Sequence, residues 1–384
     1  MNCLLSIIIP TKNRYNTLLP LLDYLISIKS NQLEIVIQDN SDDNNSILKF
    51  LNANPDRKLS YFHTNKKLSQ TGNSDLAVKN SQGEYVCFIG DDDGVMPYIV
   101  DIVQWMKNEG VDVVKGHKPH YSWPGLQISY LEEDVSGVLR YKKWNNKVRS
   151  IDCKKELNNT LSKGGTTLTM LPCLYHGIVS RAVLDRIYAK TNSYFPGPSP
   201  DMANAIALCF YVDNYKFLDF PVVVSGKSSS SIGGQGVLHK HIARIEDVAH
   251  LPSSTKNNWS TKIPKYWTGP TIWAESTIKS LEACGRSSKM NRMDFSHLYA
   301  ELFVFEFKYR KQIFKNFGHS IYSASFFINL VKIFIKRTFT FILNKTKVKI
   351  NSRNGVKDIG QAIAILEKEV DKNYLFFLNK DKSV

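Results

Sequence analysis

The chain of 384 residues lacks several features that would assign it to a class at once. Its six cysteines are scattered without a CxxC pair, which argues against a disulfide framework and a zinc site and fits a reducing cytosol. No stretch of about 18 uncharged apolar residues is present, so we expect no membrane-spanning helix. The first residues show neither a basic segment nor a small-residue cleavage site, and we expect no secretory signal peptide. With 43% hydrophobic residues the chain can bury a core.

Acidic residues are scarce in the last third of the chain, which is where most of the net charge of +15 arises. Residues 251–384 hold 23 Lys and Arg against 10 Asp and Glu, whereas residues 1–250 hold 27 against 25. A basic tail of this kind is typical of proteins that meet a membrane, a nucleic acid or another polyanion. The alternative is a basic surface that only promotes solubility, because composition alone does not choose a partner.

The first 115 residues alternate between apolar runs of strand length and segments with helical spacing. We expect strands at 4–9, 34–38, 59–63, 85–89 and 111–115, and helices at 16–28, 74–80 and 98–107. Strands that alternate with helices predict an α/β fold with a mostly parallel sheet flanked by helices. Ligands of such sheets bind at the carboxyl ends of the strands, so the polar clusters that follow the strands should meet in one crevice.

The later segments are less regular. Residues 116–170 should form loops and short strands, followed by strands at 175–179 and 222–224, helices at 181–189 and 201–211, and a mostly helical region after about 270. The Ser- and Gly-rich stretch 225–236 is either a plain linker or an active-site lid. We therefore expect a catalytic domain over 1–250, with halves at 1–115 and 116–250, and a basic, mostly helical region over 251–384.

Three acidic residues, Asp91, Asp92 and Asp93, follow directly on the expected strand 85–89. Like charges this close repel one another, and a divalent cation would remove the repulsion. Oxygen ligands suit Mg²⁺ or Mn²⁺, and the cation would in turn bind the phosphates of a nucleotide. The alternative is an acidic turn that caps the next helix, because Asp and Gly are common turn residues.

Together with two earlier segments, this motif resembles the family 2 glycosyltransferases, which have the GT-A nucleotide-sugar-binding fold. The matching segments are SIIIPTKNR at 6–14, EIVIQDNSDD at 34–43 and GEYVCFIGDDD at 83–93. Their order and spacing also match those of the family. The resemblance is specific over residues 3–115, weaker over 170–225 and absent after about 250. It implies a Rossmann-like GT-A sheet, to which this chain adds a C-terminal helical extension.

The resemblance also implies a nucleotide-sugar site that draws on all three segments. Its residues would be Pro10, Thr11, Asn13, Arg14, Asp39, Asn73, Asp91 and Asp92. In the family, the acid that ends the second strand, here Asp39, hydrogen-bonds the uracil ring, and a carboxylate can accept the ring N–H. Gly72 stands where relatives often carry an arginine, so a uridine or phosphate contact is either missing or supplied by Lys66, Lys67 or Arg14.

Within the acidic motif, the resemblance implies that one acid binds the ribose and another the metal. Two registers stay open: Asp92 as the ligand, or the pair Asp91 and Asp93. We assign the metal to Asp92 and Asp93, with His239 as a third ligand. Related enzymes carry a histidine or basic residue after a loop of the 225–236 type, and neutral imidazole binds metals. An ordinary surface position is the alternative for His239.

Asp201 is the candidate catalytic base. Inverting glycosyl transfer is a single displacement in which the acceptor hydroxyl loses its proton, and a carboxylate can take it. The resemblance places this base at a helix start, often as Glu-Asp, whereas here the preceding residue is Pro200. The alternative is that Asp201 only favours the helix dipole in the first turn.

Residues 307–357 contain 12 Lys and Arg and no acid, with aromatic and aliphatic residues in between. Helical spacing places Asn329, Lys332 and Lys336 on one polar stripe. A basic amphipathic helix with an aromatic face is typical of attachment to an anionic membrane surface. The alternative is a helix that packs on the catalytic domain with solvated lysines.

We interpret the chain as an inverting, metal-dependent glycosyltransferase that moves a sugar from a UDP-sugar to a hydroxyl of a glycan or lipid-linked acceptor. We expect it in the cytoplasm, peripheral on the inner face of the cell membrane, in bacterial capsule or O-antigen synthesis. A nucleotidyltransferase on a related sheet is one alternative, although residues 10–14 lack the Gly-rich phosphate loop it would need. A nucleic-acid-binding protein is another, but no nucleic-acid motif is present and we expect no nucleic acid as a partner.

Overall fold

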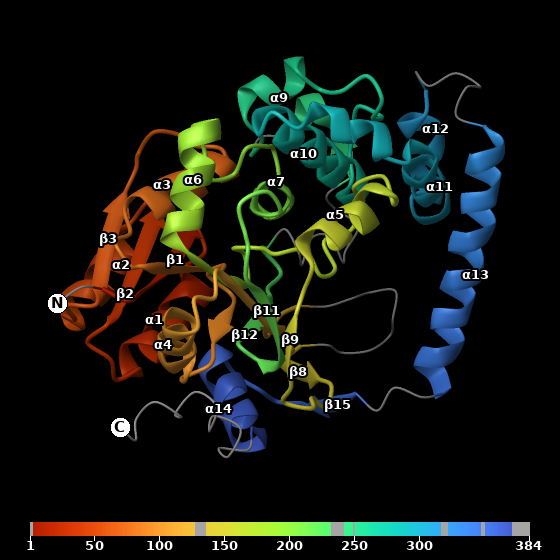
Figure 1. The fold of residues 1–384 in the computed structure, drawn as a ribbon. Helices are drawn as coiled ribbons and strands as arrows, with labels where there is room; N and C mark the ends of the chain where they lie inside the picture. Colours follow the sequence, from red (N-terminus) through yellow and green to blue (C-terminus); the bar gives the residue numbers. More distant parts are fainter. Residues whose placement is uncertain are drawn as a thin grey trace.

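An eight-stranded sheet with helices on both faces forms the centre of the molecule (Figure 1). The computed structural model describes residues 3–126, 136–231, 242–248, 250–315, 322–346 and 350–370. In sheet order the strands are β3 (Leu59–His63), β2 (Leu33–Asp39), β1 (Leu5–Thr11), β4 (Tyr85–Phe88), β10 (Gly177–Ser180), β6 (Val113–His117), β11 (Tyr215–Pro221) and β9 (Val148–Ser150).

The strand directions create a crevice beside β1. Strands β3, β2, β1 and β4 run parallel, β10 is antiparallel between β4 and β6, β11 is parallel to β6, and β9 is antiparallel at the edge. Because β2 and β4 lie on opposite sides of β1, the connections diverge there, and this is the place where α/β sheets bind ligands. The predicted α/β class, with a largely parallel sheet flanked by helices, is confirmed.

Among the described residues up to 210, the helices are α1 (Tyr15–Ser27), α2 (Asn45–Ala53), α3 (Gln70–Lys79), α4 (Ile99–Asn108), α5 (Cys153–Leu161), α6 (Arg181–Thr191) and α7 (Pro200–Leu208). The sequence pattern did not predict α2 or α5. Helix α2 is short and buries Ile47, with Phe50 and Leu51 partly buried against the same core, and it follows a polar cluster that indicated a loop. Helix α5 lies inside 116–170, where we expected only loops and short strands, and its start is fixed by Asp152, which caps the backbone of Lys154 and Lys155.

A second, five-stranded sheet joins the C-terminal part of the chain to its middle. Its order is β15 (Asn351–Arg353), β8 (Val138–Tyr141), β7 (His120–Ser122), β12 (Val223–Lys227) and β5 (Gly94–Val95). The region after about 270 is mostly helical, and it also contains the strand β15, which pairs with β8 and which the sequence pattern did not predict. A strand of three residues leaves no periodic signal in the sequence.

Helix α14 (Ile359–Glu369) returns to the N-terminal half of the molecule and lies beside α1 (Figure 1). Its residues Ile359, Ile363 and Leu366 belong to the same hydrophobic core as Leu18 and Leu21 of α1. The chain therefore completes the core of its first half with residues from its last part.

The remaining elements form a helical layer beside the sheet. They are β13 (Ala243–Arg244), η1 (Ile245–Asp247), α9 (Ser253–Asn257), β14 (Tyr266–Trp267), α10 (Gly269–Ala283), η2 (Ser287–Arg292), α11 (Phe295–Phe305), η3 (Phe307–Tyr309), α12 (Arg310–Ile313) and α13 (Ala324–Thr346). Helix α10 packs against α7, where the Ser280 hydroxyl donates to the Ala203 carbonyl at 2.8 Å. Within the described part of the chain, no helix combines the length and apolarity needed to cross a membrane.

Candidate active site

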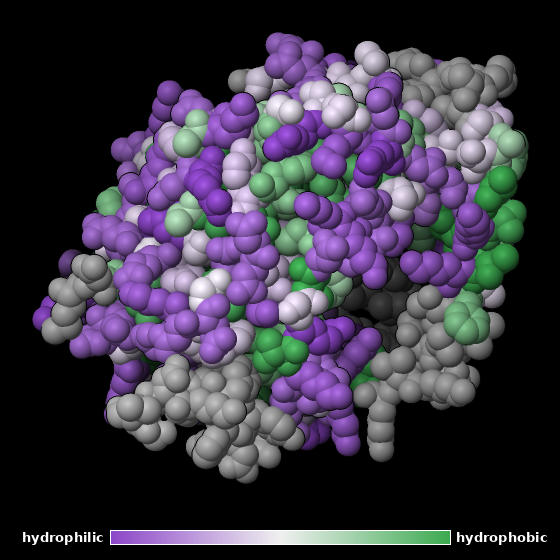
Figure 2. Space-filling view, viewed as in Figure 1, coloured by the Kyte–Doolittle hydropathy of each residue, from purple (hydrophilic) through white to green (hydrophobic). Residues whose placement is uncertain are grey.

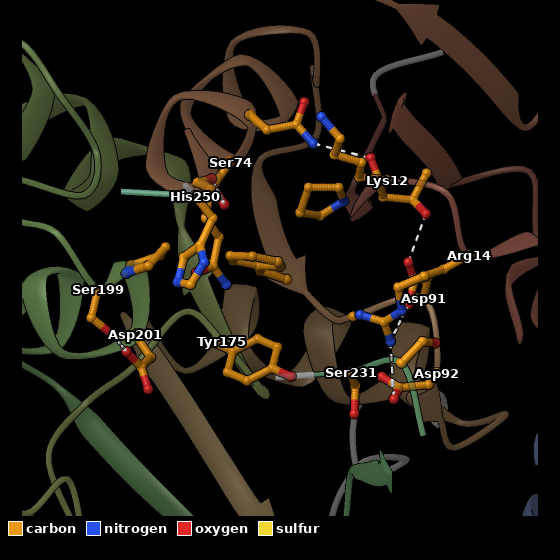
Figure 3. Close-up of a pocket in the computed structure, with 18 of the residues that line it drawn as sticks. Lys12, Arg14, Ser74, Asp91, Asp92, Tyr175, Ser199, Asp201, Ser231 and His250 are labelled. Carbon is orange, nitrogen blue, oxygen red and sulfur yellow. Dashed lines mark hydrogen bonds and ion pairs between the residues drawn. The ribbon is translucent and has the colours of Figure 1, made fainter. Parts of the chain in front are cut away.

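A cavity of about 710 Å³ opens at the carboxyl ends of β1 and β4. It is lined by eight of the ten residues that the sequence assigned to the site and that the structure describes: Pro10, Thr11, Asn13, Arg14, Asn73, Asp91, Asp92 and Asp201. Figure 3 shows Arg14, Asp91 and Asp92 on one side, Ser199 and Asp201 on the other, and Tyr175 between them. Asp39 and Asp93 do not line the cavity. His239 lies outside the described residues.

Arg14 and the first two acids form an ion-pair cluster at one wall of the cavity (Figure 3). A guanidinium nitrogen of Arg14 lies 2.6 Å from Oδ1 of Asp91 and 3.0 Å from Oδ2 of Asp92. The other oxygen of Asp91 accepts the Thr11 hydroxyl at 2.6 Å. Arg14 comes from the loop after β1 and the acids from the loop after β4, so the parallel pairing of β1 with β4 brings them together.

Burial and charge act in opposite directions on these two acids. Burial raises the pKa of Asp91 to about 7, even though Arg14 and the Thr11 hydroxyl favour the carboxylate. Burial also raises the pKa of Asp92, against the effect of Arg14. The two acids in turn raise the pKa of Arg14, so this guanidinium is always charged. The cluster therefore holds one permanent positive charge between two carboxyl groups.

Asp93 is held away from the cavity by four hydrogen bonds. Its Oδ2 accepts from the Gly90 backbone at 2.7 Å, from Nε2 of His176 at 2.7 Å and from the Tyr175 hydroxyl at 3.1 Å. Its Oδ1 accepts from the Gly226 backbone at 2.8 Å. Burial opposes ionisation of Asp93, but the charge and hydrogen bond of His176 prevail and lower its pKa. Its carboxylate fixes the surrounding chain and lies 1% exposed.

Asp39 is likewise surrounded by donors from its own neighbourhood. Its Oδ2 accepts the hydroxyls of Tyr15 at 2.6 Å and Tyr61 at 3.0 Å, and its Oδ1 accepts the Ser41 backbone at 2.8 Å. The side chain is fully buried. The sequence could not reveal these partners, because Tyr61 comes from β3 and joins Asp39 only through the sheet.

Asn73 presents an open hydrogen-bond acceptor beside the cavity. Its Nδ2 donates to the carbonyls of Thr11 and Gln38 at 3.3 Å each, which ties α3 to β1 and β2. Its Oδ1 is buried and accepts no hydrogen bond among the residues that the structure describes. A buried acceptor without a donor is unfavourable unless a ligand supplies one. Asn73 therefore keeps one buried acceptor for which the described chain supplies no donor.

Asp201 stands at the first turn of α7, on the opposite side of the cavity from Arg14 (Figure 3). Its Oδ1 accepts the backbone N–H of Met202 at 2.8 Å and the Ser199 hydroxyl. Among the described residues, none donates a hydrogen bond to its Oδ2. One carboxylate oxygen is thus held in place, while the other keeps its lone pairs for a proton donor in the cavity.

Several other residues that line the cavity were not among the site residues predicted from the sequence. They are Tyr175, His176, His250, Trp267 and Trp273. The last three lie after the point where the family resemblance ends, and only their aromatic character could have suggested them. The Nε2 atom of His250 is buried and finds no hydrogen-bond partner in the described chain. Burial lowers the pKa of His250, which favours the neutral imidazole.

The first part of the Ser- and Gly-rich stretch forms a wall of the cavity and is attached to the acids. Ser228 donates both its backbone N–H, at 3.0 Å, and its hydroxyl, at 2.9 Å, to Oδ2 of Asp92. Gly226 approaches so closely that a Cβ atom there would lie 1.6 Å from the Asp92 carbonyl oxygen, so only glycine fits. Residues 232–236 of this stretch lie outside the described chain.

The donor set fits a divalent cation that arrives with phosphate groups. Asp91 and Asp92 offer carboxylate oxygens at the cavity wall, which is the ligand type of Mg²⁺ and Mn²⁺. Within the described ranges, no group of three His, Cys, Asp or Glu residues could hold a metal alone. Mg²⁺ commonly binds through one or two carboxylates plus substrate phosphates and water, which matches this pair.

The segments that form this cavity wall match a known protein family. Residues 6–171 match the family described as Glycosyl transferase family 2. These residues form a family 2 glycosyltransferase domain. The match includes Arg14, Asn73 and the acidic motif, whereas Asp201 lies beyond the C-terminal end of the glycosyltransferase match.

One curated relative matches part of the glycosyltransferase domain. It is the GalNAc(5)-diNAcBac-PP-undecaprenol beta-1,3-glucosyltransferase of Campylobacter jejuni, 30% identical over 115 residues. These residues make up 29% of this chain and 37% of the relative, so the match spans little more than a third of that protein.

Among solved structures, the chain is similar to Staphylococcus aureus TarS. For TarS in complex with UDP-GlcNAc the identity is 12%, the coverage is 86% of this chain and 79% of that chain, and the TM-score is 0.48. For TarS in complex with UDP the identity is 14%, the coverage is 91% and 96%, and the TM-score is 0.44.

Proposed function

We propose that this chain is an inverting glycosyltransferase that moves a sugar from a UDP-sugar to a hydroxyl group of a glycan or lipid-linked acceptor. The observation that carries the proposal is the cavity itself, in which the Arg14, Asp91 and Asp92 cluster faces Asp201. The family 2 domain supplies the first three of these residues. A phosphate-binding wall and a separate carboxylate are the two parts that single-displacement glycosyl transfer requires.

The nucleotide would lie along the wall formed by the glycosyltransferase domain. Asn73 Oδ1 would accept a base N–H, since it is buried and lacks a donor in the described chain. Arg14 and Lys12 line the same cavity and would bind phosphate oxygens through charged hydrogen bonds. Asp39, which the resemblance assigns to the uracil ring, is fully buried and does not line the cavity, so it would reach the base only if the surrounding residues moved.

Asp201 would take the proton of the acceptor hydroxyl. Its Oδ1 is fixed by Met202 and Ser199, which leaves Oδ2 oriented and available. A positioned carboxylate of this kind contributes about 10²–10⁴-fold through general base catalysis. Ser228 and Gly226, which attach the start of the 225–236 stretch to the acidic motif, would hold that segment over the phosphates and limit access of water.

We propose Mn²⁺ or Mg²⁺ as the cofactor, held by Asp91 and Asp92 together with the donor phosphates. When bound, the cation offsets the negative charge that develops on the leaving diphosphate. Asp93, which the sequence placed among the ligands, would first have to release His176, Tyr175 and two backbone donors. This favours the register in which Asp92 and not Asp93 contacts the cation.

The acceptor side of the cavity is aromatic. Tyr175, Trp267 and Trp273 line it, and flat aromatic faces suit the apolar faces of sugar rings. The name of the Campylobacter relative describes a glucosyltransferase whose substrate is a glycan on PP-undecaprenol. We propose that the acceptor here is of the same general class, a glycan under assembly for a bacterial surface polysaccharide such as capsule or O-antigen.

A nucleotide panel tests the donor proposal. Thermal shifts measured with UDP, GDP, CDP and dTDP, each with and without Mn²⁺, should show the largest stabilisation for UDP with Mn²⁺. An acceptor screen with the corresponding UDP-sugars would follow. Equal shifts for all four nucleotides would exclude a uracil-specific site. Binding to nucleic acid that falls steeply with salt, without any UDP binding, would replace the proposal with the nucleic-acid alternative.

We also propose that α13 rests on an anionic membrane surface. One side of α13 packs on α11 through Phe326 and Ile333, which contact Ala300. The other side is exposed and apolar, and comprises Phe327, Ile328, Val331, Phe334, Ile335 and Phe339. Phe334 and Ile335 are 64% and 62% exposed. Figure 2 shows this hydrophobic surface at the edge of the molecule where Figure 1 places α13.

The charges around that face support a lipid surface as the proposed partner. Lys332 and Lys336 are exposed on the same helix, within a stretch of 51 residues that contains no acid. Exposed apolar patches of this kind mark interaction sites. Each Lys or Arg close to an anionic bilayer contributes about 1 kcal/mol, and inserted aromatic side chains add apolar burial. The attachment would be peripheral, on the inner face of the cell membrane.

Co-sedimentation with liposomes tests the attachment. The full chain should sediment with vesicles of anionic lipid and much less with neutral lipid, and Lys332→Glu with Lys336→Glu should abolish the difference. Lys49→Glu with Arg57→Glu is the matched control, because these two exposed cations lie near α2, on the side of the molecule away from α13 (Figure 1). Equal recovery with both lipids, or equal loss in both double variants, would contradict the proposal.

A further inference from the structure

Arg14 already occupies the position between the two acids that a divalent cation would use. One of its guanidinium nitrogens contacts Oδ1 of Asp91 and Oδ2 of Asp92 at 2.6 and 3.0 Å. The acidic side chains are 1% and 5% exposed and that of Arg14 is 21% exposed. A charge on this partly buried guanidinium therefore neutralises carboxylates that water hardly reaches.

Most of the other contacts that the acidic motif can make are already used. Oδ2 of Asp91 accepts from Thr11, and Oδ2 of Asp92, which also contacts Arg14, accepts twice from Ser228, so that among the described residues only Oδ1 of Asp92 has no donor. Both oxygens of Asp93 are used by the Gly90 and Gly226 backbones, His176 and Tyr175. A metal ion that approaches Asp91 and Asp92 together would thus meet the guanidinium, and two positive charges at this distance repel.

We propose that Arg14 is an exchangeable counter-ion: it neutralises Asp91 and Asp92 in the absence of nucleotide and leaves them when a divalent cation enters. The inference rests on the proposed function for the identity of the cation and its phosphates. The displaced guanidinium remains in the same cavity, where a phosphate is the natural partner for its five donors. Its Nε is buried and has no acceptor among the described residues, so one donor is already unused.

The exchange has a consequence for metal binding without nucleotide. In the wild-type chain, a divalent cation alone must displace Arg14 and gains no phosphate ligand in return. Its affinity should therefore be low, and it should rise when the nucleotide offers phosphate oxygens to both the metal and Arg14. Removing Arg14 should open the acidic pair to the metal even without nucleotide, because the two carboxylates then lose the guanidinium that they contact.

Titration of the full chain with Mn²⁺ alone tests this, with free Mn²⁺ followed by electron paramagnetic resonance. Arg14→Met should bind Mn²⁺ at least about tenfold more tightly than the wild type, because the competing charge is gone. Arg14→Lys keeps the charge and should stay close to the wild type. Arg57→Met removes an exposed arginine and should change nothing. Asp92→Asn in the Arg14→Met background should remove the gained binding.

Thermal denaturation gives a second readout that needs no catalysis. Without metal, Arg14→Met should melt several degrees below the wild type, and Mn²⁺ should restore most of the loss while it barely shifts the wild type. Should Arg14→Met fail to fold, Arg14→Gln removes the same charge but keeps a donor for Asp91, and it should show the same gain in Mn²⁺ affinity.

Equal Mn²⁺ affinity in the wild type and in the neutral variants would overturn the exchange, and so would the absence of Mn²⁺ binding in all of them. Neither result depends on sugar transfer. Failure of every UDP-sugar as a donor would instead contradict the proposed function, and it would leave the Mn²⁺ titration as an independent measurement.

Discussion

The imidazole of His176 donates from Nε2 to Oδ2 of Asp93 at 2.7 Å, with both side chains almost fully buried. The backbone of His176 has a φ of 61°, a left-handed conformation that residues other than glycine rarely adopt. Asp93 therefore stabilises a strained position on the cavity wall while it also accepts from two backbone amides. Its role in the structure differs from that of Asp91 and Asp92, which face the cavity.

Replacing Asp93 should thus affect stability more than ligand binding. In Asp93→Asn, an amide NH2 group replaces one of the two carboxylate oxygens and cannot accept a hydrogen bond. At least one buried donor is then unpaired, so we expect a loss of about 2–4 kcal/mol in the free energy of unfolding. Denaturant titration would measure it, with the exposed Asp185→Asn as the control. A stability unchanged from the wild type would show that the four hydrogen bonds do not matter to the fold.

Asn73 gives a prediction for nucleotide affinity. Asn73→Ala should weaken UDP binding by about 1–3 kcal/mol, because a buried acceptor for the base N–H is lost. Asn80→Ala is the matched control: it ends α3, and its Nδ2 donates to Gln38 rather than facing the cavity. Isothermal calorimetry with UDP and Mn²⁺ would distinguish them, and equal affinities for the two variants would exclude Asn73 from base recognition.

Helix α14 should be needed for the stability of the first half of the chain. Ile363 is 1% exposed and lies in the core shared with α1, so Ile363→Ala should lower the free energy of unfolding by about 2–4 kcal/mol. The partly buried Ile365 on the same helix provides the control, and Ile365→Ala should cost clearly less. If both substitutions have the same small effect, α14 does not contribute to that core.

Glu275 of α10 provides a pH dependence of stability. Burial raises its pKa to about 7, although the Ser260 backbone and Lys279 favour the charged form. Since the pKa is higher in the folded than in the unfolded state, this group stabilises the fold at low pH and loses that contribution as pH rises from about 4.5 to 7.

Glu275→Gln removes that titration. The stability of the variant relative to the wild type should increase by about 1–3 kcal/mol as the pH rises from 5 to 8, because Glu275 of the wild type becomes a buried charge over this range. Denaturant titrations at the two pH values would measure the difference. A constant difference between variant and wild type across this range would mean that Glu275 does not titrate in it.

The sequence predicted the parts of the molecule that depend on local pattern. Strands β1 to β4 are short apolar runs, and the polar residues after them, Arg14 and Asp91 among them, meet because parallel strands share one carboxyl edge. The basic helix expected around Asn329, Lys332 and Lys336 is present as α13. These features required no knowledge of distant contacts.

What the sequence missed depends on partners far along the chain. Asp93 looked like a metal ligand, but His176 and Gly226 follow it by 83 and 133 residues and take up its oxygens. The return of α14 to α1 leaves no periodic signal beyond an ordinary amphipathic helix. His250 lines the cavity but lies outside the segments that resemble the family, so no motif predicted it.

The central claim is that Asp201 accepts a proton from the acceptor while a UDP-sugar is bound at Arg14, Asp91 and Asp92. The most direct measurement is UDP release from a UDP-sugar with and without acceptor, alongside UDP affinity, in the wild type, Asp201→Asn and the exposed control Asp213→Asn. We expect acceptor-dependent release to fall at least about 10²-fold in Asp201→Asn, with UDP affinity changed by only a few-fold. Undiminished release in Asp201→Asn, or lost UDP binding in that variant, would contradict the account.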